Sequence, residues 1–163
     1  PLDPEGQEQC TRAGMELKKY AIQTDKIYTS DLKRARESAK IIAKILDFKP
    51  EVVEETAFRE MALGSWDGMF IREIMEKYPE EYKARGQNML SYRIDEHAEN
   101  FYDLQKRVLK RFHEILHGSK DDIIIVGHAG VNRVIMCDVL KKDLNEIFDI
   151  KFPRGAIEIL ELT

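Results

Sequence analysis

Apolar residues form an unbroken β-branched run over residues 123–126, with charged residues before it and a glycine after it. A short run of this kind is typical of a strand that is buried on both faces of a parallel sheet. Apolar positions recur at helical spacing over residues 131–139, so a strand, a tight turn and a helix are predicted in succession. His128 therefore lies at the carboxyl end of a predicted strand and beside the start of a predicted helix, which is where α/β proteins bind ligands.

The rest of the chain also alternates between short apolar runs and amphipathic segments. Asp3 and Pro4 suit the start of one helix, and Ser30 is predicted to cap the next, with Asp31 in its first turn. Pro79 is expected to interrupt a further helix. The predicted helices cover residues 3–21, 30–46, 71–78, 99–117, 131–139 and, briefly, 143–148; the predicted strands cover residues 26–29, 52–53, 123–126 and 156–162; loops are predicted at 58–68 and 86–98.

This alternation indicates an α/β fold, a three-layer structure in which a mostly parallel sheet carries helices on both faces. No internal repeat or flexible linker divides the chain, so residues 1–163 are predicted to form a single domain. The chain opens with a helix and offers only three or four strands, two of them short. One more strand would cover such a sheet better, so we expect the domain to be N-terminally incomplete, with its first strand before Pro1.

Composition argues against several classes of function. The 163 residues carry a formal net charge of -4, so there is no general positive field to attract nucleic acid. Hydrophobic residues make up 43% of the chain, and no apolar run approaches the length that spans a membrane. Cys10 and Cys137 both fall in predicted helices, and they are interpreted as reduced thiols. A cytoplasmic protein that binds neither nucleic acid nor membranes is therefore expected.

His128 is the first candidate for chemistry. A histidine, small residues at positions 127, 129 and 130, and the N-terminus of a helix together provide what a phosphate pocket requires. Residues 29–34 repeat this arrangement of strand end, cap and helix start, and Arg34 lies one turn into the helix, where it can add a fixed charge. The residues by themselves equally allow a histidine that only caps a turn. For Arg34 taken singly, an arginine on the solvated face of an amphipathic helix is the commoner case.

Residues 59–68 form a second candidate, a loop that contains Glu60, the only tryptophan, Trp66, and two glycines. A carboxylate held beside Trp66 in a semi-apolar loop would have its proton affinity raised and would serve as an acid. The alternative is a turn whose tryptophan simply fills a space in the core.

Taken together, five segments resemble, in the same order, segments of the histidine phosphatase superfamily, also called the phosphoglycerate mutase-like family. The segments are residues 1–9, 30–39, 59–68, 98–108 and 126–133. In the fourth segment the family usually has Gly-Glu-Ser at a helix start, and here only Glu99 is kept, with Arg107 behind it. In its size and acid-bearing loop, the chain is most similar to the branch of broad phosphatases and α-ribazole phosphatases.

The resemblance implies a phosphomonoester hydrolase that acts on a small phosphorylated metabolite through a phosphohistidine, with no cofactor and no metal. It implies that Arg34 and His128 hold the phosphoryl oxygens, with Ser30 and Ala129 beside them, and that Glu60 is the general acid and base. These roles fit phosphoryl transfer, in which positioning and charge stabilisation supply most of the catalysis. The family's nucleophile lies in an Arg-His-Gly motif on a central first strand, and the 163 residues contain no such motif.

Other interpretations stay open. Phosphoglycerate mutase-type phosphotransfer would use the same residues, although the short chain favours a phosphatase. A non-catalytic module would use Arg34 and His128 only to bind a phosphorylated ligand. Residues 113–117 match the zinc-protease pattern His-Glu-x-x-His, but both histidines fall off the apolar stripe of their helix and no convincing third ligand follows, so no metal is expected. A homodimer is compatible with the sequence.

Overall fold

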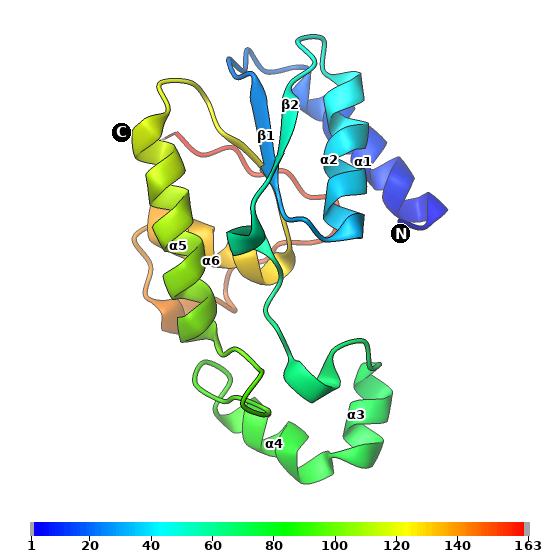
Figure 1. Ribbon diagram of the computed structural model, residues 1–163, viewed down its shortest axis with the longest axis vertical. Coiled ribbons are helices and arrows are strands. Elements are labelled where there is room, and N and C mark those ends of the chain that lie inside the picture. The colour runs from blue at the N-terminus through cyan, green and yellow to red at the C-terminus, as the bar shows by residue number, and fades with distance from the viewer. Residues whose placement is uncertain (1, 162–163) are drawn as a thin grey trace.

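The computed structural model describes residues 2–161 and contains a three-stranded parallel sheet flanked by helices (Figure 1). The strand order is β2-β1-β3, with bounds Glu51–Glu54 (β2), Lys26–Thr29 (β1) and Ile124–Val126 (β3). Ile27 in the middle strand pairs with Val52 on one side and with Ile124 on the other. The parallel α/β class is confirmed, and so are the strands predicted near residues 26, 52 and 123, apart from small differences at their ends.

Successive residues of a strand point to opposite faces of the sheet, and here they enter two separate cores. Ile27 and Ile124 are buried in one core with residues of α1 and α2, whereas Tyr28 and Ile125 pack against the other core with residues of α5 and α6. The bounds of these helices are Pro4–Leu17 (α1), Lys33–Ile45 (α2), Phe101–Gly118 (α5) and Ala129–Val139 (α6). Helices therefore cover both faces, as the sequence predicts, although α1 ends at Leu17 instead of near residue 21.

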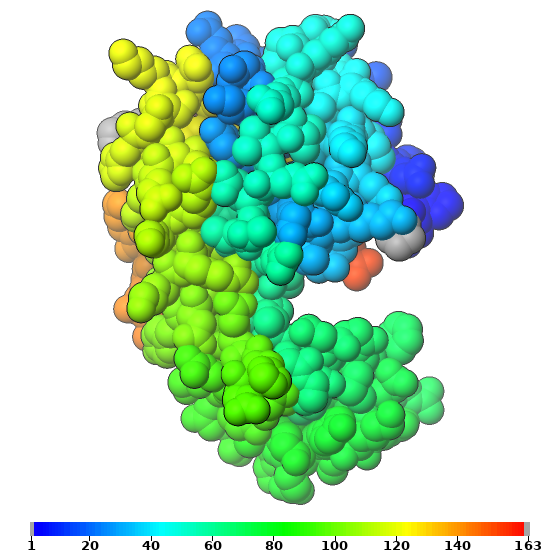
Figure 2. Space-filling model, viewed as in Figure 1, coloured from blue at the N-terminus to red at the C-terminus, as the bar shows by residue number. Residues whose placement is uncertain are grey.

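Helices Ile71–Lys77 (α3) and Pro79–Gln87 (α4) project from the sheet as a lobe (Figure 1). The surface is hollowed between this lobe and the body that contains the sheet (Figure 2). Pro79 is the first residue of α4 and Tyr78 precedes it, so the predicted interruption at Pro79 is confirmed. The sequence pattern does not predict α4, because none of its residues is buried and no apolar period marks it.

The strand predicted over residues 156–162 is wrong for the part of it that the structure describes. Residues 156–161 form no strand, and position 162 lies outside the described residues. Ile157 packs against the core that contains Ile124 of β3, yet among residues 2–161 no backbone hydrogen bond joins this segment to β3. The alternating apolar residues here reflect side-chain packing without strand pairing. The short helix predicted at 143–148 is a single 3-10 turn, Leu144–Glu146, capped by Asp143.

Both cysteines are free, Cys10 half-buried and Cys137 buried. Burial raises the pKa of the Cys137 thiol, and because the thiolate is the reactive form, this cysteine acts as a packing residue. Across the described residues, no helix combines the length and the apolar character needed to cross a membrane.

Candidate functional site

The carboxyl ends of β1 and β3 bring two distant parts of the sequence together. Thr29 and Val126 are paired in the sheet, and the Thr29 hydroxyl donates to the Val126 carbonyl at 2.7 Å. The residues that follow β1 therefore lie beside those that follow β3, and Ser30 Oγ and His128 Nε2 are 2.7 Å apart. Ser30 is fully buried and His128 is only 8% exposed. The two predicted phosphate-binding residues therefore form one hydrogen-bonded unit.

His128 stands at the N-terminus of α6 in a positive electrostatic environment. It is the N-cap residue, with extended backbone, and its carbonyl accepts the N–H of Asn132 at 2.8 Å. Burial and the positive charge of Arg34 lower the pKa of His128 to about 4, with a smaller effect from Arg107, whereas Glu60 acts in the opposite direction. The imidazole is therefore neutral at pH 7. Burial disfavours charge of either sign, but the part of the shift that comes from Arg34 and Arg107 is positive charge near the ring, which would stabilise an anion.

Ser30 does not cap α2 as predicted. The helix begins at Lys33, and its N-cap is Leu32, which makes no side-chain capping bond. The Ser30 hydroxyl is instead shared with His128 and lies 3.4 Å from the Leu32 N–H. Asp31, predicted in the first turn of the helix, precedes it and accepts from Arg59 Nε at 2.6 Å and from the Arg59 guanidinium end. The side chains of Ser30 and Asp31, which the local sequence predicts at the start of the helix, therefore bond to His128 and Arg59, both of which are distant in the sequence.

Arg34 is the second residue of α2 and is exposed. Its side chain forms no hydrogen bond or ion pair with any residue between positions 2 and 161, although its charge acts on His128. Most other arginines near the sheet are engaged with carboxylates, as Arg59 is with Asp31. A guanidinium near a buried neutral histidine and without a carboxylate partner is suited to hold an oxyanion by two N–H bonds.

Ala129 is the first residue of α6 and is exposed. The N–H groups of a helix's first turn lack partners within the helix, and they carry the positive end of the helix dipole. The predicted role of Ala129 in phosphate binding therefore falls on its backbone, because a methyl side chain offers no polar group.

Glu60 reaches the same helix end from the loop that follows the 3-10 turn Thr56–Phe58. Its Oε2 accepts from the Gly130 N–H at 3.2 Å, and its Oε1 accepts from the Met61 N–H at 3.0 Å. A Cβ atom at position 130 would lie 2.5 Å from Glu60 Oε1, so the carboxylate fits here because residue 130 is glycine. Three separate segments thus meet at one end of the sheet, on the side of the hollow in Figure 2.

Among the described residues, the Glu60 carboxylate accepts hydrogen bonds from the backbone N–H groups of Met61 and Gly130. Trp66 is 3% exposed and lies near Tyr78, with ring centroids 6.0 Å apart. The tryptophan is therefore a buried core residue, which is the alternative that the sequence left open for it.

Glu99 and Arg107 belong to the site's surroundings, and sequence reasoning gave them no role. Arg107 Nε donates to Glu99 at 2.6 Å, and Arg107 also donates to the Glu60 carbonyl at 3.3 Å. The available signal was their spacing: eight residues separate them across the start of α5, which is about two helical turns.

His113 and His117 do not assemble a metal site. His113 Nε2 lies 2.7 Å from Asp138 Oδ2, which links α5 to α6, and the two imidazole centroids are 6.1 Å apart. Between residues 2 and 161 no group of three or more histidine, cysteine or acidic residues is arranged to hold a metal ion. The zinc-protease pattern at residues 113–117 therefore gains no support.

Comparison with known proteins points to one family. The family model described as histidine phosphatase superfamily (branch 1) matches residues 1–163. A metal-independent phosphoserine phosphatase from Arabidopsis thaliana is 37% identical over 110 residues, which are 67% of this chain and 46% of that protein. Phosphoserine phosphatase 1 from Hydrogenobacter thermophilus is 26% identical over 167 residues, covering 99% of this chain and 76% of that protein.

The fold is also similar to that of solved structures. The α-ribazole phosphatase from Shigella flexneri superposes with a TM-score of 0.81 at 23% identity, covering 95% of this chain and 75% of that one. The chain thus spans about half the length of the Arabidopsis thaliana relative and three quarters of the Shigella flexneri structure.

Proposed function

This chain belongs to branch 1 of the histidine phosphatase superfamily, and from that membership and the geometry above we propose that it forms the phosphate pocket of a phosphomonoester hydrolase. The observation that carries the proposal is that His128 and Glu60 meet at the N-terminus of α6, where the charge of Arg34 acts on His128. His128 supplies a buried neutral imidazole and Glu60 a carboxylate, and Arg34 supplies a guanidinium that has no hydrogen-bond or ion-pair partner among residues 2–161. In this proposal Arg34 supplies a positive charge, His128 forms hydrogen bonds to the phosphoryl group, and Glu60 gives and takes a proton.

In this proposal the phosphoryl group of the substrate lies between Arg34 and the N-terminus of α6. Arg34 donates two N–H bonds to its oxygens, and Ser30, His128 and the backbone of Ala129 bind the others. A phosphate dianion opposes the effects that lower the pKa of His128, so the ring gains a proton as the ligand binds. The protonated ring then donates to the phosphoryl oxygen, and charge stabilisation grows as the transition state forms.

Glu60 is the proton donor and acceptor. A histidine nitrogen attacks phosphorus while the bond from phosphorus to the leaving oxygen breaks, and protonated Glu60 gives its proton to that oxygen. In the second half, water attacks the phosphohistidine. The carboxylate of Glu60 then takes a proton from the water as the bond between phosphorus and nitrogen breaks. The hydrogen bond from the Gly130 N–H to Glu60, two residues beyond His128, supports both steps.

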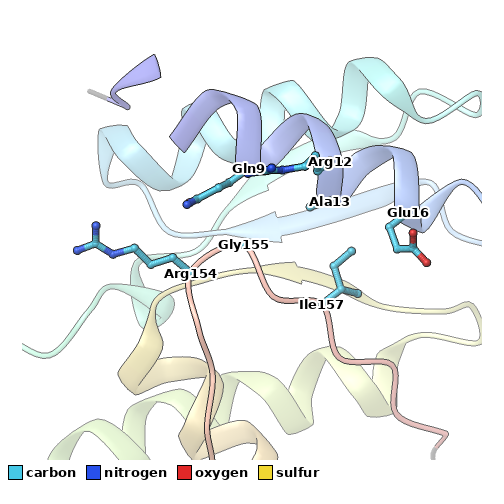
Figure 3. A pocket seen from close by; sticks show the side chains of 7 residues that line it. All are labelled: Gln9, Arg12, Ala13, Glu16, Arg154, Gly155 and Ile157. Atoms are coloured by element: carbon cyan, nitrogen blue, oxygen red, sulfur yellow. The ribbon is translucent and has the colours of Figure 1, made fainter. Parts of the chain in front are cut away.

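The nucleophile of this proposal is a histidine in an Arg-His-Gly sequence on an extended segment that adds to the free edge of β3. Within residues 2–161 that edge has no strand partner. A cavity of about 490 Å³ lies between α1 and residues 154–157, and Figure 3 shows Gln9, Arg12, Arg154 and Ile157 around it. An unpaired edge of a parallel sheet offers backbone N–H and C=O groups to an added strand.

Phosphatase activity is favoured over the mutase alternative, because relatives matching 67% and 99% of this chain are both named phosphoserine phosphatases. The substrate class that this supports is a small phosphorylated metabolite with a polar leaving group. The carboxylate of Glu60 favours catalysis over the binding-module alternative, since a pocket that only binds phosphate does not need an acid beside it.

Hydrolysis of p-nitrophenyl phosphate by the full-length protein, with and without EDTA, tests this proposal. Turnover that survives EDTA is expected. Turnover that EDTA abolishes would contradict the metal-free mechanism, and phosphate binding without any turnover would favour the binding module.

Glu60→Gln tests the acid specifically. Phenyl phosphate has a poor leaving group that needs a proton, whereas p-nitrophenyl phosphate needs little assistance. We expect the substitution to lower kcat/KM for phenyl phosphate by roughly 100-fold or more and to affect kcat/KM for p-nitrophenyl phosphate much less. The ratio kcat/KM is compared because hydrolysis of the phosphohistidine, which also uses Glu60, is common to both substrates and affects kcat. Asp67→Asn, a change of the same kind in the same loop, serves as the control. Equal losses on the two substrates would remove Glu60 from the acid role.

A further inference from the structure

One ion pair binds the loop that carries Glu60. Arg107, in the second turn of α5, donates to both carboxylate oxygens of Glu99, through Nε at 2.6 Å and Nη2 at 2.7 Å. A guanidinium joined to a carboxylate by two parallel bonds holds a fixed orientation, which a lysine cannot reproduce. The remaining hydrogen-bonding capacity of both side chains goes to the loop.

These bonds fall before, at and after the acid along the chain. Arg107 Nη1 donates to the Ala57 carbonyl at 2.7 Å, and Nη2 donates to the carbonyl of Glu60 itself at 3.3 Å. Glu99 accepts from the Ala62 N–H at 3.0 Å, and its own N–H donates to the Ala62 carbonyl at 2.9 Å. Two side chains therefore fix the backbone on both sides of Glu60.

The pair keeps its charge although it is largely shielded from solvent. The side chains of Arg107 and Glu99 are 26% and 22% exposed. Burial raises the pKa of Glu99, but the hydrogen bonds from Arg107 and from a loop N–H outweigh it and hold the pKa below its ordinary value. The Glu60 carboxylate itself has only two backbone N–H partners among the described residues, so its location depends on the loop.

We propose that Arg107, oriented by Glu99, is the positioning residue for Glu60, holding the general acid at the N-terminus of α6. The inference rests on the function proposed above for Glu60. Arg107 also contributes, after burial and Arg34, to the lowered pKa of His128, which indicates that its charge lies close to the phosphate pocket.

A positioning role and a purely structural role predict different kinetics. If Arg107 holds Glu60 in place for proton transfer, its replacement slows substrates whose leaving oxygen needs a proton and spares those with a good leaving group. If Arg107 only stabilises the fold, its replacement lowers the amount of active protein and affects both kinds of substrate equally.

The experiment compares kcat/KM for phenyl phosphate and p-nitrophenyl phosphate in the full-length protein. The ratio kcat/KM reports the steps up to phosphoryl transfer, even where hydrolysis of the phosphohistidine limits kcat. The variants are Arg107→Lys, Glu60→Gln and their combination. Arg93→Lys is the matched control, because Arg93 makes a similar two-bond pair with Asp103, at 2.8 and 2.6 Å, close to the start of the same helix.

For Arg107→Lys we expect kcat/KM for phenyl phosphate to fall by roughly 10- to 100-fold and that for p-nitrophenyl phosphate to change by less than about threefold. Adding Arg107→Lys to Glu60→Gln should cause little further loss, since a residue that acts through another has no effect once the other is gone. Arg93→Lys should leave both substrates unchanged.

Two results would overturn the inference: equal losses on both substrates, or losses that multiply in the double variant. If Arg107→Lys does not fold, Glu99→Gln is measured in its place and should show the same preference for phenyl phosphate. Failure of the underlying function is recognised separately, because then Glu60→Gln itself shows no dependence on the leaving group.

Discussion

Gly130→Ala is a substitution that helix propensity favours and that the proposed acid cannot tolerate. Gly130 is the second residue of α6, and alanine is a better helix former than glycine by up to about 1 kcal/mol. On secondary structure alone, the change should be neutral or stabilising. The tertiary structure predicts a different outcome for activity, because the space in front of this glycine is occupied by Glu60.

The size of the effect follows from two distances. An added Cβ atom would lie 2.5 Å from Glu60 Oε1 and 3.2 Å from Leu104 Cδ2. The carboxylate is the end of a flexible side chain, so it moves away by about 1 Å to reach ordinary contact, while the backbone stays in place. That movement breaks the bond between Glu60 and the Gly130 N–H. A misplacement of about 1 Å in a catalytic group costs on the order of 100-fold in rate.

The assay measures kcat/KM for phenyl phosphate and p-nitrophenyl phosphate together with the melting temperature. Gly130→Ala should lose about 100-fold on phenyl phosphate, much less on p-nitrophenyl phosphate, and nothing in melting temperature. Gly86→Ala is the control, since Gly86 lies in α4 and a Cβ atom there meets nothing within 4 Å. Full activity of Gly130→Ala on phenyl phosphate would refute the assignment of Glu60 as an acid held against α6.

Two further predictions concern charge. The pKa of His128 is about 4 in the folded protein, against 6.5 for a free histidine. Between these two pH values the unfolded chain binds a proton at His128 and the folded protein does not. The free energy of unfolding should therefore fall as the pH is lowered from near 6.5 to about 4, by roughly 2 kcal/mol at pH 5. Urea unfolding at pH 7 and pH 5 should show this contribution disappear in His128→Gln and persist in His117→Gln; an identical pH dependence in His128→Gln and the unsubstituted protein would contradict it. Arg34→Ala should weaken binding of inorganic phosphate by roughly 10- to 100-fold in calorimetry without lowering the melting temperature, because the exposed guanidinium has no protein partner among the described residues. Lys33→Ala, in the same exposed turn, should leave phosphate affinity within a few-fold, and equal losses in the two variants would indicate a general charge effect.

Local sequence was sufficient for most of the elements. The β-branched run at residues 123–126 and the apolar stripe of α5 each encode burial with the period of their own structure, and both are found as predicted. The pattern failed where burial and secondary structure diverge. Helix α4 has no buried residue and hence no period, whereas residues 156–161 carry apolar side chains for a core without joining the sheet.

The candidate site, too, was predicted only in part from the sequence. The sequence by itself singled out His128 and Arg34, because each follows a predicted strand at the start of a helix, and the resemblance to a known family then singled out Glu60 within the loop of residues 59–68. Only the tertiary structure decided that Ser30 bonds to His128, 98 residues away, instead of capping α2, and that Glu60 contacts Gly130 across 70 residues. The role of Arg107 was likewise set by partners up to 50 residues distant. A side chain's choice among hydrogen-bond partners depends on which groups folding brings within about 3 Å, and that distance is fixed by the packing of helices on the sheet and not by the residues on either side of it.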